Sequence, residues 1–120
     1  MSLVLVAEDS ASVRLLLVRR LEMSGHEVIE AQTGDEALGL AGNGAGVRTP
    51  DIVLLDAMMP GATGPDVLKR IKSERPELPV IVISAQPDLA LTEEWQAADA
   101  RLRKPIDFDD LLSRVETLTS

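Results

Sequence analysis

Short apolar runs alternate with stretches of helical periodicity along the whole chain. The runs 3–7, 52–55 and 80–83 are uninterrupted, as is typical of strands covered on both faces of a parallel sheet. Between the first runs, Val13, Leu16, Leu17 and Leu21 recur at the three- and four-residue spacing of a helix. The pattern therefore predicts strands and helices in strict alternation.

This alternation predicts five strands and five helices. The strands are expected at residues 3–7, 26–30, 51–56, 80–84 and 101–104, and the helices at about 12–23, 35–40, 64–74, 87–98 and 107–118. The fourth helix is weak in pattern, and Gly42 to Gly46 is expected to be a flexible loop. Such a chain is an α/β protein, a single (βα)5 doubly wound domain over residues 1–120 with helices on both faces of a parallel sheet. The most apolar runs, 3–7 and 52–55, should be neighbours, and the more polar 26–30 and 101–104 should lie at the edges.

Charged and hydroxyl side chains stand where the predicted strands end. Glu8 and Asp9 follow the first run, Asp56 ends the third, Ser84 the fourth and Lys104 the fifth. The carboxyl ends of parallel strands share one edge of the sheet, where α/β proteins bind ligands. At about 5 Å and an effective dielectric of about 20, each carboxylate pair repels by roughly 3 kcal/mol. We therefore expect a divalent cation with oxygen ligands at this edge.

Composition narrows the classes of function. With 120 residues and no cysteine, the chain suits one domain without disulfides or thiolate metal sites. It has no apolar run of the roughly 20 residues that span a bilayer and no signal-peptide pattern, so we expect a cytoplasmic protein without a membrane partner. A net charge of −8 and only two aromatic residues, Trp95 and Phe108, disfavour direct nucleic acid binding.

Several short motifs together resemble the receiver domain of bacterial two-component response regulators. They are Glu8-Asp9, Asp56 followed by Met59-Pro60 and Gly64, Ser84-Ala85, Lys104-Pro105 and the stretch 33–38. Each is weak alone, but they follow in the right order over essentially the whole chain. The resemblance implies a flavodoxin-like fold with strand order 2-1-3-4-5.

The resemblance also implies roles for these residues. Asp56 would accept a phosphoryl group from a histidine kinase or histidine phosphotransfer protein. Mg²⁺ would lie among Glu8, Asp9, Asp56 and the backbone carbonyl of Met58, and Lys104 and Ser84 would contact the phosphoryl oxygens. The resemblance implies that the domain is not an enzyme acting on other substrates, because such domains catalyse only their own aspartyl phosphorylation and dephosphorylation. A downstream protein partner or output domain would read the change.

Three positions beside the implied site would tune it. The small Ala85 leaves the phosphoryl group a way in. Met58 and Gln86 flank the site. Met58 has no group that positions a water molecule well, which predicts slow self-hydrolysis of the aspartyl phosphate. The amide of Gln86 could position such a water.

The stretch between Ser84 and Lys104 departs from the family. Arg101 stands where the family usually has Tyr or Phe, and a guanidinium is not buried without a partner. We expect Arg101 to stay outside or to pair with Glu93, Glu94 or Asp99. The stretch is also slightly short, which predicts a reduced or irregular fourth helix. Trp95 within it is either a core anchor or a partner contact.

Other functions remain as alternatives. A pseudo-receiver, an interaction module that ignores phosphate, is motivated by Arg101 and opposed by the intact acids, Ser84 and Lys104. An aspartate-nucleophile phosphatase usually has a second acid two residues after the nucleophile, where this chain has Met58. A flavin-binding protein is disfavoured by the few aromatic residues. Both a stand-alone receiver and one domain of a longer protein fit the sequence.

His26 follows Gly25 in the sequence. It is expected at the surface, with no ligand or catalytic role.

Overall fold

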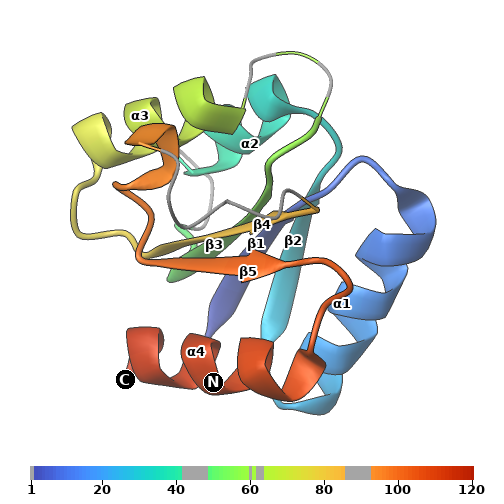
Figure 1. Ribbon diagram of the computed structural model, residues 1–120. Helices are drawn as coiled ribbons and strands as arrows, with labels where there is room; N and C mark the ends of the chain where they lie inside the picture. Colours follow the sequence, from blue (N-terminus) through green and yellow to red (C-terminus); the bar gives the residue numbers. More distant parts are fainter. Residues whose placement is uncertain (1, 42–48, 60, 62–63, 86–92) are drawn as a thin grey trace.

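The computed structural model describes residues 2–41, 49–59, 61, 64–85 and 93–120. Strands and helices alternate along the chain (Figure 1). In order they are β1 (Leu3–Ala7), α1 (Ala11–Met23), β2 (Glu27–Ala31), α2 (Gly34–Ala41), β3 (Ile52–Asp56), α3 (Gly64–Glu74), β4 (Val80–Ser84), the 3-10 turn η2 (Glu93–Trp95), β5 (Ala100–Arg103) and α4 (Phe108–Thr119).

The five strands form one parallel sheet in the order β2-β1-β3-β4-β5. This confirms both the doubly wound architecture and the strand order that the sequence resemblance implied. β1 and β3 are neighbours as predicted, with Val4 opposite Ile52. All five carboxyl ends therefore meet along one edge of the sheet.

Helices cover both faces of the sheet, because alternate residues of each strand point to opposite sides. Helices α1 and α4 pack on one face, and α2, α3 and η2 on the other, as Figure 1 shows. Val4 and Val6 face α1 and α4, while Leu5 and Ala7 face the α2 and α3 side. No helix in the described ranges is long and apolar enough to cross a membrane.

Most predicted boundaries lie within one residue of the observed ones. The N-cap of α1 is Ser10 and that of α4 is Asp107, whose side chain accepts a hydrogen bond from the backbone N–H of Asp110 at 3.1 Å. The predicted fourth helix and the 42–46 loop lie wholly or partly outside the described residues. What is described of that helix, residues 93–95, is a 3-10 turn, so the described chain has four α-helices where five were expected.

Two expectations about burial are wrong. Leu16, at helical spacing with the core residues of α1, is 54% exposed. His26, expected at the surface, is 5% exposed. Gly25, with a φ of +90°, turns the chain back so that His26, just before β2, lies beside Ser2. The His26 Nδ1 accepts a hydrogen bond from the N–H of Ser2 at 3.2 Å.

Trp95 is a core residue, which resolves the choice that the sequence left open. Its side chain lies in the cluster beneath α2 and α3 with 2% exposure. Gly64 opens α3 against it, and a Cβ at Gly64 would lie 2.7 Å from the Trp95 ring and 2.7 Å from the carbonyl oxygen of Ala57. Only glycine permits this close approach, which fixes the start of α3 beside the end of β3.

Candidate functional site

Parallel pairing brings the acids of two strands to the same level. Ala7, the last residue of β1, lies opposite Leu55, so the next residues, Glu8 and Asp56, follow at neighbouring strand ends. Asp9 comes one residue later. Each of the three acids offers one carboxylate oxygen, and these oxygens all lie within 4.8 Å of one another.

The three carboxylates differ in their access to solvent. The side chains of Glu8 and Asp56 are 3% and 5% exposed, whereas Asp9 is an exposed residue. The cluster therefore has two acids in the protein interior and one at its mouth. Such a set of hard oxygen donors suits a hydrated divalent cation.

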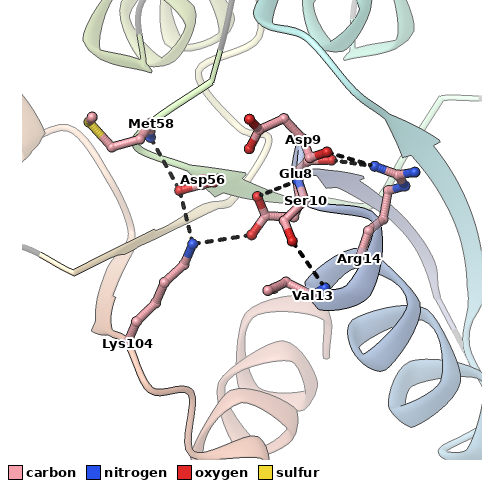
Figure 2. Close-up of polar contacts among 8 residues, drawn as sticks. All are labelled: Glu8, Asp9, Ser10, Val13, Arg14, Asp56, Met58 and Lys104. Atoms are coloured by element: carbon pink, nitrogen blue, oxygen red, sulfur yellow. Dashed lines mark hydrogen bonds and ion pairs between the residues drawn. The ribbon is translucent and has the colours of Figure 1, made fainter.

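Lys104 reaches the cluster from the end of β5 (Figure 2). Its Nζ lies 3.2 Å from the Glu8 Oε1 and 3.5 Å from the Asp56 Oδ1. The backbone N–H of Lys104 donates to the carbonyl oxygen of Ser84 at 2.8 Å, which ties the residue to the end of β4. One ammonium thus partly neutralises two buried carboxylates.

The charges shift two pKa values in this cluster. Burial raises the pKa of Glu8, and the neighbouring Asp56 carboxylate raises it further against the opposing effect of Lys104. Burial alone would lower the pKa of Lys104, but the carboxylates of Asp56 and Glu8 outweigh it and raise that pKa. Three carboxylates thus gather beside the Lys104 ammonium at this edge of the sheet.

Backbone N–H groups orient the two buried acids. The N–H of Met58 donates to the Asp56 Oδ1 at 3.2 Å, and the N–H of Ser10 donates to the Glu8 Oε2 at 3.3 Å. The Met58 side chain is 70% exposed and points away from the cluster in Figure 2. Only the backbone of Met58 is therefore near enough to act at this site.

The other predicted positions have different surroundings. Ser84 ends β4 beside β3 and is 1% exposed, and Ala85 after it is exposed. Gln86 lies outside the described residues. Arg101 is half-buried, and its Nη1 donates to the carbonyl oxygens of Trp95 and Ala98, both at 3.1 Å.

Arg101 is therefore half-buried on carbonyl partners, whereas it was expected either to stay outside or to pair with an acid. Asp99 accepts instead from the Nζ of Lys72 at 2.6 Å and from the N–H of Val80 at 2.8 Å. Glu93 is exposed, and the side chain of Glu94 lies outside the described part of the chain. The Trp95 carbonyl also accepts from the N–H of Ala98 at 3.1 Å, so the guanidinium adds a second, charged donor at the end of the turn.

Arg14 is the residue near the site that the sequence pattern missed. Its Nη1 donates to the carbonyl oxygen of Glu8 at 2.8 Å, and its Nε pairs with the Glu30 Oε1 at 3.1 Å. In the sequence it reads as part of the polar face of α1. The available signal was its position one turn after the N-cap Ser10, close to the acidic pair.

An apolar cleft of about 250 Å³ opens beside Lys104. It lies between the start of α1 and the segment leading into α4. Its lining comprises Val13, Leu16, Lys104, Pro105, Ile106 and Phe108. Leu16, which is 54% exposed, is one of these lining residues.

Comparison with known proteins agrees with this geometry. The family model for the response regulator receiver domain matches residues 4–116. The chain is 37% identical over 120 residues to the DNA-binding transcriptional regulator NtrC of Salmonella typhimurium, covering 98% of this chain and 25% of that protein. It is 36% identical over 117 residues to the response regulator MprA of a Mycobacterium species, covering 96% of this chain and 49% of MprA. The chain thus spans a quarter to a half of these relatives.

Solved structures give the same result. The response regulator TrrA of Thermotoga maritima, in complex with Mg²⁺ and BeF, superposes with a TM-score of 0.86 at 32% identity, covering 98% of this chain and 99% of TrrA. The receiver domain of the Francisella response regulator 1452 has a TM-score of 0.88 at 30% identity, covering 99% and 97%. Strand order, acidic cluster and family match agree, and the chain belongs to the receiver domains of two-component response regulators.

Proposed function

We propose that this receiver accepts a phosphoryl group on Asp56 in a Mg²⁺-dependent reaction and passes the signal on by changing its binding to a partner. The observation that carries the proposal is the convergence of three carboxylate oxygens within 4.8 Å, with the ammonium of Lys104 beside them. A cluster that is merely structural has no need of three carboxylates so close together.

The donor set fits Mg²⁺. Glu8, Asp9 and Asp56 would hold the ion together with the backbone carbonyl of Met58, and water would fill the remaining positions, as is usual for this ion. Burial raises the pKa of Glu8, and a bound cation would favour its ionised form. When bound, Mg²⁺ would lessen the repulsion between the Asp56 carboxylate and an incoming phosphoryl group.

The residues of this chain would divide the transfer between them. A carboxylate oxygen of Asp56 would attack phosphorus, forming an O–P bond as the bond from phosphorus to the donor breaks. The N–H of Met58, which already donates to Asp56, orients the nucleophile. No proton needs to leave Asp56 if its carboxylate is ionised at the start.

Lys104 and Ser84 would hold the product. The Lys104 Nζ lies 3.5 Å from the Asp56 Oδ1 and could follow the new negative charge onto the phosphoryl oxygens. The hydroxyl of Ser84, at the neighbouring strand end, would donate to another of these oxygens. Charge-assisted hydrogen bonds of this kind contribute about 1.5–3 kcal/mol each, which is enough to bias a loop between two conformations.

The partners would be a phosphodonor and a reader. A histidine kinase or histidine phosphotransfer protein would bring its phosphohistidine to Asp56, and the apolar cleft beside Lys104 offers it a contact surface. The reader would be an output domain or a separate protein. NtrC, one of the relatives, is a DNA-binding transcriptional regulator, which makes an output domain of that kind one candidate.

The test is incubation of the protein with Mg²⁺ and acetyl phosphate, followed by intact-mass measurement. We expect the mass of one phosphoryl group to be gained by the natural chain and by the control Asp109→Asn, which changes an exposed acid of α4. Asp56→Asn should gain nothing. If Asp56→Asn gains as much as the natural chain, Asp56 is not the acceptor.

The same experiment addresses two further points. No gain by a chain that still binds Mg²⁺ would favour the pseudo-receiver alternative. Once acetyl phosphate is removed, the phosphoryl group should be lost slowly, because the exposed Met58 thioether positions no water. A half-life of seconds would contradict this expectation.

A further inference from the structure

Arg14 lies beneath the turn that carries the first two acids. Its Nη1 donates to the carbonyl oxygen of Glu8 at 2.8 Å and lies 3.5 Å from that of Asp9. Its Nε pairs with the Glu30 Oε1 at 3.1 Å, and its side chain is only 13% exposed. One guanidinium therefore joins the acidic turn, its own helix α1 and the edge strand β2.

These two carbonyls need a donor from outside the sheet. β1 ends at Ala7, so the Glu8 and Asp9 carbonyls lie beyond its last paired residue. The N–H of Glu8 still donates to the carbonyl oxygen of Ala31 at 3.0 Å, which leaves the carbonyl side of the turn to Arg14. Figure 2 shows the guanidinium on the carbonyl side and the Glu8 and Asp9 carboxylates directed away from it. Holding the carbonyls thus turns the carboxylates toward Asp56 and the mouth of the site.

Glu30 keeps this cation from binding the acids themselves. An arginine so close to two carboxylates would otherwise form a bidentate pair with one of them. Its Nε is occupied by Glu30 and its Nη1 by the Glu8 carbonyl, so these two nitrogens are engaged by groups other than the side chains of Glu8 and Asp9. The acids remain available to another cation.

We propose that Arg14 is a positioning residue of the acidic cluster, which holds the carbonyls of Glu8 and Asp9 so that their carboxylates can bind a divalent cation. The inference rests on the proposed function, since it assigns this residue a part in cation binding. Residues that orient metal ligands through hydrogen bonds commonly change metal affinity by roughly 10- to 100-fold when substituted.

Charge alone predicts the opposite result. Removing a positive charge near the cluster would by itself strengthen the binding of a cation. If Arg14 positions the ligands, its removal weakens binding in spite of the lost charge. The sign of the change therefore separates positioning from bulk electrostatics, and a merely structural role would not move the affinity of the folded protein.

The experiment is a titration of the natural chain, Arg14→Gln, Arg14→Lys and Arg19→Gln with MgCl₂ at fixed ionic strength. Binding is followed by the NMR shifts of the Ala57 and Met58 amides, and the same spectra report whether each variant is folded. Arg19 is an exposed arginine on the same helix and serves as the charge-matched control. Arg14→Lys keeps the positive charge, but an ammonium lacks the planar guanidinium that contacts the Glu8 carbonyl and Glu30 at the same time. If Arg14→Gln does not fold, Arg14→Lys takes its place in the test.

We expect Arg14→Gln and Arg14→Lys to weaken Mg²⁺ binding, Arg14→Gln by roughly tenfold, and Arg19→Gln to leave it equal or slightly tighter. Unchanged or tighter binding by Arg14→Gln would overturn the inference, as would natural affinity in Arg14→Lys. In both cases the natural chain still binds Mg²⁺, so the proposed function stands. A natural chain that binds no Mg²⁺ would overturn both.

Discussion

The acidic edge above β1 and β3 and the connection between β4 and β5 differ in how their side chains find partners. At the acidic edge, Glu8 and Asp56 directly follow paired strand residues and meet because the strands are in register. In the connection, Arg101 donates to the carbonyl oxygen of Trp95 in the η2 turn, and Asp99 accepts from Lys72 of α3. These contacts do not depend on strand register. The first region is held by strand register, and the second by contacts between side chains and irregular backbone.

The comparison shows that strand register alone can bring acids together, whereas an irregular connection depends on long side chains to hold it. Trp95 packs under α3, Lys72 of α3 binds Asp99, and Arg101 holds the carbonyls of the turn. Together they tie the described part of this connection, residues 93–99, to the sheet and to α3. Arg101 therefore acts as a clamp that joins β5 to η2 and the residues that follow it.

The largest expected effect is that of Trp95→Ala. Removing a buried indole from a packed core should lower the free energy of unfolding by about 3–5 kcal/mol, whereas Mg²⁺ binding should persist because no ligand atom comes from this segment. Urea unfolding measures the first and the NMR titration the second. The control Met23→Ala, at a residue with 84% exposure, should change stability by no more than about 0.5 kcal/mol. Loss of Mg²⁺ binding in folded Trp95→Ala would break the separation between the two regions.

Arg101→Leu tests the clamp directly. The carbonyls of Trp95 and Ala98 would both lose a charged donor, so we expect a loss of about 2 kcal/mol in the free energy of unfolding. Emission from Trp95 should shift to longer wavelength as the turn loosens. Arg103→Leu, an exposed arginine on the same strand, is the matched control. Equal effects of the two substitutions would show that Arg101 holds nothing.

Lys104→Met sharpens the description of the acidic edge. The substitution removes the ammonium beside Glu8 and Asp56, which should lower stability without Mg²⁺ by about 1 kcal/mol, since the lysine keeps partial contact with solvent. Mg²⁺ binding should become tighter, because a competing cation is gone. Lys69→Met on α3 is the control, as Lys69 is exposed. Unchanged affinity in Lys104→Met would mean that this ammonium does not neutralise the cluster.

The smallest expected effect is a pH dependence from Glu8. Burial and the Asp56 carboxylate raise the pKa of Glu8, so the folded protein holds this proton more tightly than the unfolded chain does. Its contribution to stability is complete below the ordinary pKa of glutamate and is lost as the pH rises through the raised value. Urea unfolding between pH 4 and roughly pH 7 should show this contribution as the difference between the natural chain and Glu8→Gln.

Saturating Mg²⁺ should reduce the difference in the pH dependence of the free energy of unfolding between the natural chain and Glu8→Gln, because the ion favours the ionised form of Glu8. If the natural chain and Glu8→Gln have the same pH dependence without Mg²⁺, the pKa of Glu8 is not raised.

Much of the fold followed from local pattern. The uninterrupted runs at β1, β3 and β4 are typical of strands buried on both faces, and their alternation with amphipathic stretches implied the parallel sheet. The meeting of Glu8, Asp9 and Asp56 was predictable for the same reason, since each directly follows or ends a strand. The strand order came from the family resemblance, because alternation alone permits several orders.

The errors have a common physical origin. His26 is buried because the turn at Gly25 brings it beside Ser2, which is distant in sequence. Arg101 binds the carbonyls of Trp95 and Ala98 because η2 and the residues after it place them beside β5, and no pattern of residue types predicts where a short irregular turn directs its carbonyls. Both outcomes depend on contacts that no periodic spacing encodes.

The sequence by itself determined which residues end the strands and therefore which acids share an edge, since a parallel sheet places all its carboxyl ends together whatever packs around them. Only the tertiary structure decided the partners of the long side chains of Arg14, Arg101 and Lys104. Each has several rotatable bonds and could reach many acceptors, so its partner is chosen by the packing of helices and turns that are far apart along the chain.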